Sequence, residues 1–399
     1  MRAHLFFALF LFACGDAASS PADAATDAAP PDVFAPASHL APPTVVNAGG
    51  DVLASPKVVV VTFESDPLAP QIEAFAQAIG KSAYWSATTS EYGVSGLAYT
   101  AAVHVADALP TPLTEDAFES WLAGELDGTH AEWPAFDPDT IYSVVLPKDA
   151  GVMVDGVPPC ESSPAYHYEI PNANGSGKSL VYAAVNRCDP FAGLAGIDYV
   201  TAGLSHEWIE AATDPHYVTG PAWEAPAEQY VDWTLTTGGE VADMCTNRSD
   251  VYFQPADLAF TVQRSWSNAS ATAGHDPCVP AEAGAYFGAA PELDATVHGS
   301  YDGEPFASEG VHALVGSTVT VPVDLFSDAP TDPFTVSAHA FDQAKLTFTW
   351  DRTSGQNGDQ LILTIERTGD GPNTKGADFF TIAAQQGTRQ SVWMGAIGN

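Results

Sequence analysis

The chain has 399 residues, with 50 Asp and Glu against 13 Lys and Arg, a formal net charge of −37 and a pI near 4.2. This charge argues against a nucleic-acid partner, because phosphate binding needs clustered cations, and against docking of the protein surface on anionic lipid. Hydrophobic residues make up 46% of the chain, so a large core is expected, and the length favours two domains.

The N-terminus is typical of an export signal. Met1-Arg2 supplies a basic start, and residues 5–13 form an apolar run that is shorter than the roughly 20 residues a membrane-spanning helix needs. The order Leu-Phe-Ala before Cys14 resembles the bacterial lipobox, which implies that 1–14 is a lipoprotein signal segment and that Cys14 is lipidated. By the same resemblance, Gly15 implies the outer membrane. The alternative is an ordinary signal peptide with an incidental cysteine.

Residues 15–45 consist mainly of Ala, Pro, Asp and Ser. Such a segment buries too little apolar surface to fold by itself, and its prolines favour a semi-extended chain. The sequence therefore predicts a disordered tether, through which the lipid would be the protein's contact with the membrane.

Hydrophobic patterning predicts the elements of a first domain, over residues 46–285. Runs of β-branched residues bounded by turn residues indicate buried strands, and apolar residues at a period of 3.6 indicate helices. The expected strands are 57–64, 140–147 and 180–186, and the expected helices are 69–82, 115–127 with Thr114 as its N-cap, and 195–213.

The pattern changes after residue 285. A segment rich in Gly, Ala, Pro and Asp at 283–294 predicts a linker. Short alternating runs with frequent turn residues follow, which predicts an Ig-like β-sandwich over 290–399. Its seven expected strands are 296–300, 317–325, 334–340, 345–350, 360–366, 379–384 and 390–394.

Five cysteines are present. If Cys14 is lipidated, four remain, and an even number in an exported chain indicates disulfides. Of the three possible connectivities we favour the local one, Cys160–Cys188 with Cys245–Cys278, because each bridge would brace one segment.

The segment SHEWIE at 205–210 carries the clearest chemical signal. On a helix, His206 and Glu210 share a face, because residues four apart lie one turn apart. Imidazole and carboxylate are both good zinc ligands. This is the spacing of the H-E-x-x-H zinc helix with the second histidine replaced by glutamate, and in that motif the Glu after the first His, here Glu207, is the general base.

A third ligand is expected from Glu240 or Asp243, which are spaced three residues apart in the segment GGEVADMC. This arrangement resembles the gluzincin group of zincin metallopeptidases, in which a second helix gives a Glu ligand and a nearby Asp orients a ligand of the first helix. The resemblance implies Glu240 as ligand and Asp243 as orienting residue; the opposite assignment stays open. A second carboxylate adds negative charge and weakens zinc as a Lewis acid, which bears on catalysis more than on metal binding. Because hard cations prefer oxygen ligands, calcium is an alternative ion.

Other roles stay open for several of these residues. His206 and Glu210 could form only a helix-surface pair, worth a few tenths of a kcal/mol. His167 is a candidate transition-state donor, although a strand-surface histidine is the plainer interpretation. Asp214 is more readily a helix terminator before Pro215 than a ligand.

The wider order of segments, including YAAVNRC and SHEWIEAATDP within 57–280, resembles uncharacterised secreted bacterial proteins with H-E-x-x-E-A-x-T-D-P. It is also distantly similar to the plant phosphate-induced, exordium-like proteins. The resemblance to zincins implies an α+β fold with a mixed sheet and an active-site helix. The all-β sandwich, which lies outside this resemblance, is expected to follow it.

These observations predict a lipid-anchored, extracytoplasmic, zinc-dependent hydrolase, and the resemblance to zincins implies that its substrate is a peptide or protein. His206, Glu210 and either Glu240 or Asp243 would hold the metal, Glu207 would be the general base, and His167 is the further catalytic candidate. The alternative is a non-catalytic surface lipoprotein that carries a structural metal or none.

Overall fold

The computed structural model describes residues 34–399, apart from 107, 149, 155 and 162–163. The predicted signal segment 1–14 with Cys14, and the predicted tether up to residue 33, lie outside the described residues. Residues Ala35–Asn399 pack as one unit. A search of the described part finds no helix that is both long and apolar enough to span a bilayer.

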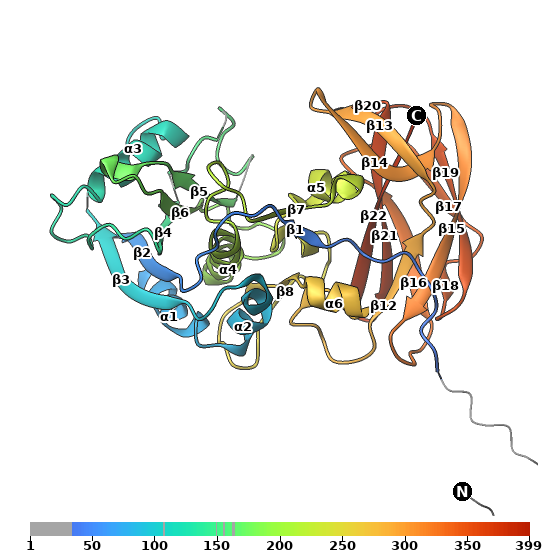
Figure 1. Cartoon of the computed structure of the whole chain (residues 1–399), viewed down its shortest axis with the longest axis horizontal. Helices are drawn as coiled ribbons and strands as arrows, with labels where there is room; N and C mark the ends of the chain where they lie inside the picture. The colour runs from blue at the N-terminus through green and yellow to red at the C-terminus, as the bar shows by residue number, and fades with distance from the viewer. Residues whose placement is uncertain (1–33, 107, 149, 155, 162–163) are drawn as a thin grey trace, which may run out of the picture. The chain divides into compact units, whose positions relative to one another are not determined.

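A five-stranded sheet organises the N-terminal part of this unit (Figure 1). Its strand order is β3-β2-β4-β6-β5, and neighbouring strands are parallel except at one edge, where β5 runs antiparallel to β6. The strands are β2 (Lys57–Phe63), β3 (Ala98–Val105), β4 (Thr140–Val145), β5 (Ala165–Ile170) and β6 (Leu180–Val185).

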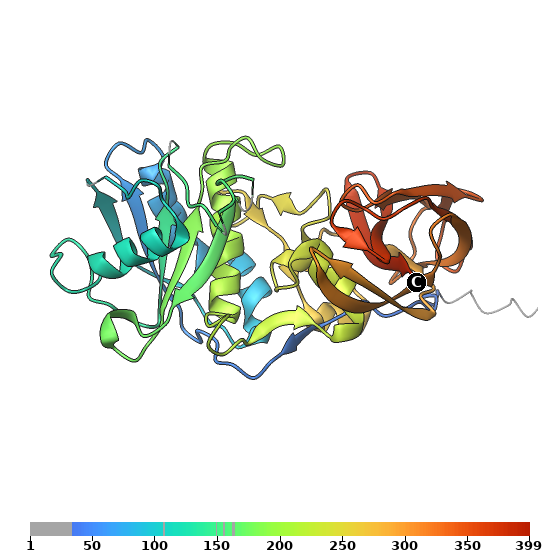
Figure 2. The ribbon, with the colours of Figure 1, turned by 90° about the horizontal axis from the view of Figure 1, so that it is seen from above.

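Helices cover both faces of this sheet. The inner strands β4 and β6 are buried at every residue, as expected where a parallel sheet is covered on both sides. Helices α1 (Ala69–Ile79) and α4 (Ile197–Thr213) pack on one face, and α3 (Glu115–Glu125) packs on the other (Figures 1 and 2). The predicted N-cap of α3 is present, because Thr114 Oγ1 accepts a hydrogen bond from the Ala117 amide.

The remaining elements before residue 280 are short. Three two-stranded sheets join β1 to β7, β8 to β9 and β10 to β11. Their strands are β1 (Val45–Asn47), β7 (Trp223–Pro226), β8 (Tyr252–Phe253), β9 (Val262–Gln263), β10 (Ser265–Trp266) and β11 (Cys278–Val279). The helices are α2 (Ala83–Thr89), α5 (Val231–Thr237) and α6 (Asn268–Ala273), and the 3-10 turns are η1 (Ser90–Tyr92), η2 (Ala173–Gly175), η3 (Glu228–Tyr230) and η4 (Asp243–Cys245).

The C-terminal part forms two further sheets, ordered β12-β15-β19-β17 and β18-β16-β21-β22-β14-β13-β20. Neighbouring strands are antiparallel except β14 and β22, which are parallel. The strands are β12 (Phe287–Pro291), β13 (Ala295–Tyr301), β14 (Glu304–His312), β15 (Ser317–Ser327), β16 (Phe334–Ala340), β17 (Leu346–Trp350), β18 (Ser354–Gly355), β19 (Gln360–Arg367), β20 (Thr374–Lys375), β21 (Ala377–Gln386) and β22 (Arg389–Gly398).

The predicted fold class, an α+β zincin-like domain followed by an all-β sandwich, is wrong. Among the described residues, strands hold 36% and helices 20%, and six separate sheets are found, so this part of the chain is mostly β and a zincin fold is not seen. The physical reason is that many strands depend on distant partners. Val45 of β1, for example, lies opposite Pro226 of β7, and such short pairs leave no periodic pattern in the sequence.

The predicted linker at 283–294 is also wrong, because β12 lies within it and is buried at all five residues. Its sequence, FGAAP, consists mostly of small residues and shows no alternation. The small residues are required by packing. A Cβ atom at Gly288 would lie 2.3 Å from the ring of Phe326 on the neighbouring strand β15. Because there is no room for a larger side chain at this position, the buried strand lacks the run of large apolar residues by which it could have been predicted.

The predicted disorder of the tether does not extend to its last residues, 35–45. The Asn357 side chain donates to the carbonyl of Ala35 and accepts from the amide of Ala37, both at 2.9 Å. The His39 ring stacks on Phe326 with ring centroids 3.5 Å apart. Order in this segment therefore comes from side chains distant in sequence, which the composition of the segment itself does not reveal.

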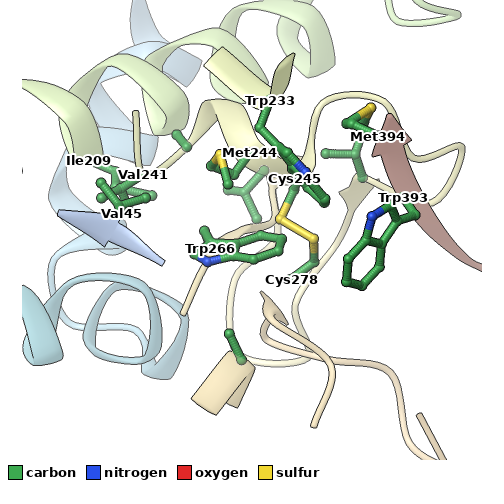
Figure 3. Packing of buried hydrophobic residues seen from close by; sticks show 14 of the residues in the cluster. Val45, Ile209, Trp233, Val241, Met244, Cys245, Trp266, Cys278, Trp393 and Met394 are labelled. Carbon is green, nitrogen blue, oxygen red and sulfur yellow. A yellow bond between two sulfur atoms is a disulfide. The ribbon is translucent and has the colours of Figure 1, made fainter. Parts of the chain in front are cut away.

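The two predicted disulfides, Cys160–Cys188 and Cys245–Cys278, are confirmed. Figure 3 shows the second bridge surrounded by large apolar side chains. Trp233 of α5 packs edge-on against Trp266 at 5.5 Å and against Trp393 of β22 at 6.0 Å. The bridge therefore fixes η4, which ends at Cys245, to a rigid part of the core.

Candidate metal centre

Helix α4 supplies three of the predicted site residues, and its other face attaches it to the sheet. The indole N–H of the fully buried Trp208 donates to the Ser143 hydroxyl on β4. His206, Glu207 and Glu210 lie on the side away from this contact, because residues three or four apart on a helix share a face. Glu207 and Glu210 are each only 3% exposed, so the site contains carboxyl groups that are buried away from water.

The His206 imidazole lies among three carboxylates. Its Nε2 atom is 3.0 Å from Glu210 Oε2, 3.5 Å from Asp243 Oδ1 and 3.9 Å from Glu207 Oε1. Its other nitrogen, Nδ1, lies 2.8 Å from the side-chain amide of Gln263. Gln263 Nε2 donates to this nitrogen and also to the Ala242 carbonyl, so Nδ1 accepts, the ring is held with Nε2 facing the carboxylates, and in the neutral ring the proton lies on Nε2.

His167 enters the same cluster from β5, the edge strand beside α4. Its Nδ1 atom is 3.5 Å from Glu207 Oε2 and 3.6 Å from Glu210 Oε2, and its Nε2 atom is 3.6 Å from Glu240 Oε1. The structure thus brings together all six predicted site residues. It separates the two candidates for the third ligand: Asp243 lies beside His206, and Glu240 lies beside His167.

Glu240 and Asp243 do not share a helix, although the resemblance to gluzincins implied one. Asp243 begins the 3-10 turn η4, and Glu240 lies before it. The preceding Gly238 and Gly239 have φ values of +115° and +99°, a backbone region that favours glycine. The chain therefore reaches the site through a glycine turn instead of a helix.

Three buried polar atoms in the cluster have no hydrogen-bond partner: Glu210 Oε1, Glu240 Oε1 and His167 Nε2. Each such atom costs about 1–3 kcal/mol when it is left unsatisfied. Imidazole nitrogens and carboxylate oxygens are the donor types that zinc binds in hydrolases. The residues present therefore fit a divalent metal ion, which would satisfy these atoms.

The electrostatics of the cluster point in the same direction. Burial lowers the pKa of His206 and His167, but the surrounding carboxylates outweigh burial and hold both pKa values well above the ordinary one. Burial raises the pKa of Glu210, but the two imidazoles outweigh it and lower this pKa to about 2. Burial and the charge of Glu210 raise the pKa values of Glu240 and Asp243 well above the usual range. With all four carboxyls ionised the cluster would hold more negative charge than its two imidazoles balance, so in the absence of a cation Glu240 and Asp243 keep their protons more readily than free carboxyls do.

Two residues near the cluster have other roles. Asp214 ends α4, as expected, and its Oδ1 atom accepts a 2.7 Å hydrogen bond from the Ala222 amide. Gln263 was not predicted as a site residue. It lies on the two-residue strand β9, and its fixed orientation comes from a second contact of its side chain, 2.8 Å from the Ala242 carbonyl. Only the folded chain brings it to His206.

A cavity of about 520 Å³ adjoins the cluster. Its wall includes His206, Glu207 and Asp243 on the polar side. The apolar side includes Leu194 and Tyr252. A substrate in this cavity would therefore contact the His206 side of the cluster.

Gly238→Ala is expected to displace Asp243, because a Cβ atom at Gly238 would lie 1.9 Å from Asp243 Oδ2. The expected result is a loss of metal affinity of about 10- to 100-fold, measured by competition with a chelator. Gly128→Ala is the matched control, since Gly128 also has a positive φ, +89°, but nothing lies within 4 Å of its added Cβ. Equal affinity in both variants would show that Asp243 does not bind the metal.

Comparisons with known proteins add little. No family model and no curated protein matches the chain. Domains 4 and 5 of the S-layer protein SbsC are 16% identical over 27% of this chain and 54% of theirs, with a TM-score of 0.17. A chimeric titin Z1Z2 is 16% identical over 26% of this chain and 96% of its own, and titin M3 is 10% identical over 26% and 97%, each with a TM-score of 0.16. Scores this low support neither a fold nor a function.

Proposed function

We propose that this protein is a zinc-dependent hydrolase that acts outside the cytoplasm on peptide bonds. The observation that carries the proposal is the buried cluster around α4, in which His206 and Glu210 lie 3.0 Å apart and Glu210 retains an unpartnered oxygen. The predicted lipoprotein signal, with Cys14, and the two disulfides support the extracytoplasmic location. Zinc is the proposed ion, and calcium is the alternative that the same experiment measures.

Metal binding and proton transfer are assigned to different residues of the cluster. His206, Glu210 and Asp243 would hold the metal on the side that faces the cavity. When bound, zinc supplies a Lewis acid that polarises a substrate carbonyl. Glu207, which also lines the cavity, accepts the proton of the attacking water and passes it to the leaving amine.

The test is the metal content of the full-length protein, measured by elemental analysis after expression with zinc and calcium present. We expect at least one zinc per chain in the wild type and about one fewer in His206→Ala. His298→Ala is the control, because His298 lies on an exposed face of β13. Absence of zinc from the wild type would contradict the proposal, and calcium in its place would assign the site to a hard cation.

A second candidate function, a non-catalytic surface protein, is supported by the direct contacts between imidazoles and carboxylates. In that case the cluster would be a buried network of ion pairs, or a structural metal site, that stabilises the fold. The two candidates differ in the consequence of replacing Glu207, since a structural site has no turnover to lose.

A further inference from the structure

We propose that the cluster binds two divalent ions, which share Glu210, and that His167 is a ligand of the second ion. This inference rests on the metal site proposed above and extends it. Within the cluster, two groups of three potential ligands have Glu210 in common: His206 with Glu207 and Glu210, and His167 with Glu210 and Glu240. In each group one ligand atom from every member lies within 4.8 Å of the others. In the first half, Glu207 is the residue assigned above to proton transfer, and Asp243, 3.5 Å from His206 Nε2, is the third ligand.

The carboxylate of Glu210 lies where it could bind both ions. Its Oε2 atom lies 3.0 Å from His206 Nε2 and 3.6 Å from His167 Nδ1, so the carboxylate is close to both imidazoles. Its Oε1 atom is buried without a hydrogen-bond partner, and the residue is only 3% exposed. A carboxylate offers two oxygens with lone pairs to spare, and ions in two-metal hydrolytic sites lie about 3.5–4 Å apart, a spacing that one carboxylate can bridge.

Each half of the cluster has its own imidazole and its own second carboxylate. Asp243 lies 3.5 Å from His206 Nε2, and Glu240 lies 3.6 Å from His167 Nε2. His167 is 8% exposed, and its Nε2 atom has no hydrogen-bond partner. This arrangement gives a role to both of the partly buried residues Glu240 and Asp243, where one ion with a single third ligand would need only one of them.

The charge balance also favours two ions. Four carboxylates gather here, from Glu207, Glu210, Glu240 and Asp243, and the ion pairs found among the described residues join them to histidine but to no lysine or arginine. When all four carboxyls are ionised and the imidazoles are neutral, one divalent ion leaves two negative charges to be balanced by protons or left unpaired, and buried unpaired charge is costly. A second divalent ion brings the cluster to neutrality.

The two imidazoles differ in their access to substrate. His206 and Glu207 line the 520 Å³ cavity, whereas the residues that line it do not include His167, Glu210 or Glu240. The ion beside His167 would therefore lie behind the first, where it would hold Glu210 in place and add positive charge. His167 is thus assigned to metal binding instead of contact with the transition state.

The test is the number of zinc ions bound by the full-length protein, measured by titration against a chelator and by elemental analysis. We expect two per chain in the wild type and in His298→Ala, and one in each of His206→Ala and His167→Ala. Wild type with one zinc would overturn the second site while the proposed function stands. Wild type with none would overturn both.

Cobalt loading of the wild type gives a second measurement that needs no substitution. If the two ions share Glu210, their spins couple, and the electron paramagnetic resonance signal per cobalt falls between the first and the second equivalent. A signal that grows in proportion to added cobalt over both equivalents would contradict a shared carboxylate. His167→Gln, which keeps a polar side chain of similar reach, replaces His167→Ala if that variant does not fold.

Discussion

Glu207→Gln is expected to retain its zinc and to lose hydrolysis by about 10²- to 10⁴-fold, the range that a positioned general base contributes. The amide has nearly the shape of the carboxylate but cannot accept the proton of the attacking water. Glu207 is 3% exposed and lines the cavity beside His206, so the substituted side chain stays in place. The measurements are peptide cleavage, with a fluorogenic peptide library, and zinc content of the same preparation.

The result separates three cases. Loss of turnover with zinc retained supports the hydrolase, and unchanged turnover would contradict the role of Glu207. Loss of zinc together with turnover would make Glu207 a ligand, a role that its 3.9 Å separation from His206 Nε2 also permits. Glu304→Gln is the matched control, because Glu304 is an exposed residue at the start of β14.

Asp232→Asn is expected to stabilise the protein above pH 7 by up to about 4 kcal/mol, and to have little effect near pH 4. Asp232 on α5 is 1% exposed; one carboxylate oxygen accepts from the Ser308 hydroxyl of β14, and the other has no partner. Burial raises its pKa to about 7, against the hydrogen bond from Ser308, and the nearby Glu309 adds to the increase.

The direction of this pH dependence follows from the raised pKa of Asp232. The folded protein binds the proton of Asp232 more tightly than the unfolded chain, so this group stabilises the fold fully below its unfolded pKa of 3.8. That contribution is lost as the pH rises through about 7. Asparagine stays neutral at every pH, so its advantage over the wild type should grow from pH 5 to pH 8.

The measurement is urea unfolding of both proteins across this pH range, with the difference between them taken at each pH so that other titrations cancel. Asp51→Asn, at an exposed position, should show no such pH-dependent difference. A difference for Asp232→Asn that stays constant from pH 5 to pH 8 would mean that the carboxyl ionises normally in the folded protein.

The sequence predicted those features that depend on local patterning. The apolar period of α4 and the β-branched runs of β2, β4 and β6 are strong signals, because each element forms its own hydrogen bonds or lies in the middle of a buried sheet. The spacing of His206 and Glu210 follows directly from helix geometry. The pairing of cysteines could be chosen because each bridge joins neighbouring segments.

Features that depend on distant partners could not be predicted. β12 has small residues because Phe326 packs against it, and the segment 35–45 is ordered by Asn357 and Phe326. The fold class failed for the same reason, since short strands such as β1 exist only where a partner lies beside them. His167 was a site candidate, but its closeness to Glu240 depends on the position of edge strand β5 beside α4.

The docking of residues 35–45 determines how the protein should be shortened for recombinant work. A soluble fragment that begins at residue 46 would remove the backbone partners of Asn357, take His39 away from Phe326 and break the two hydrogen bonds between Asn268 and Val45. Such a fragment would expose an aromatic ring that is now 2% exposed and would invite aggregation. The first residue of a well-behaved soluble version should therefore precede Ala35.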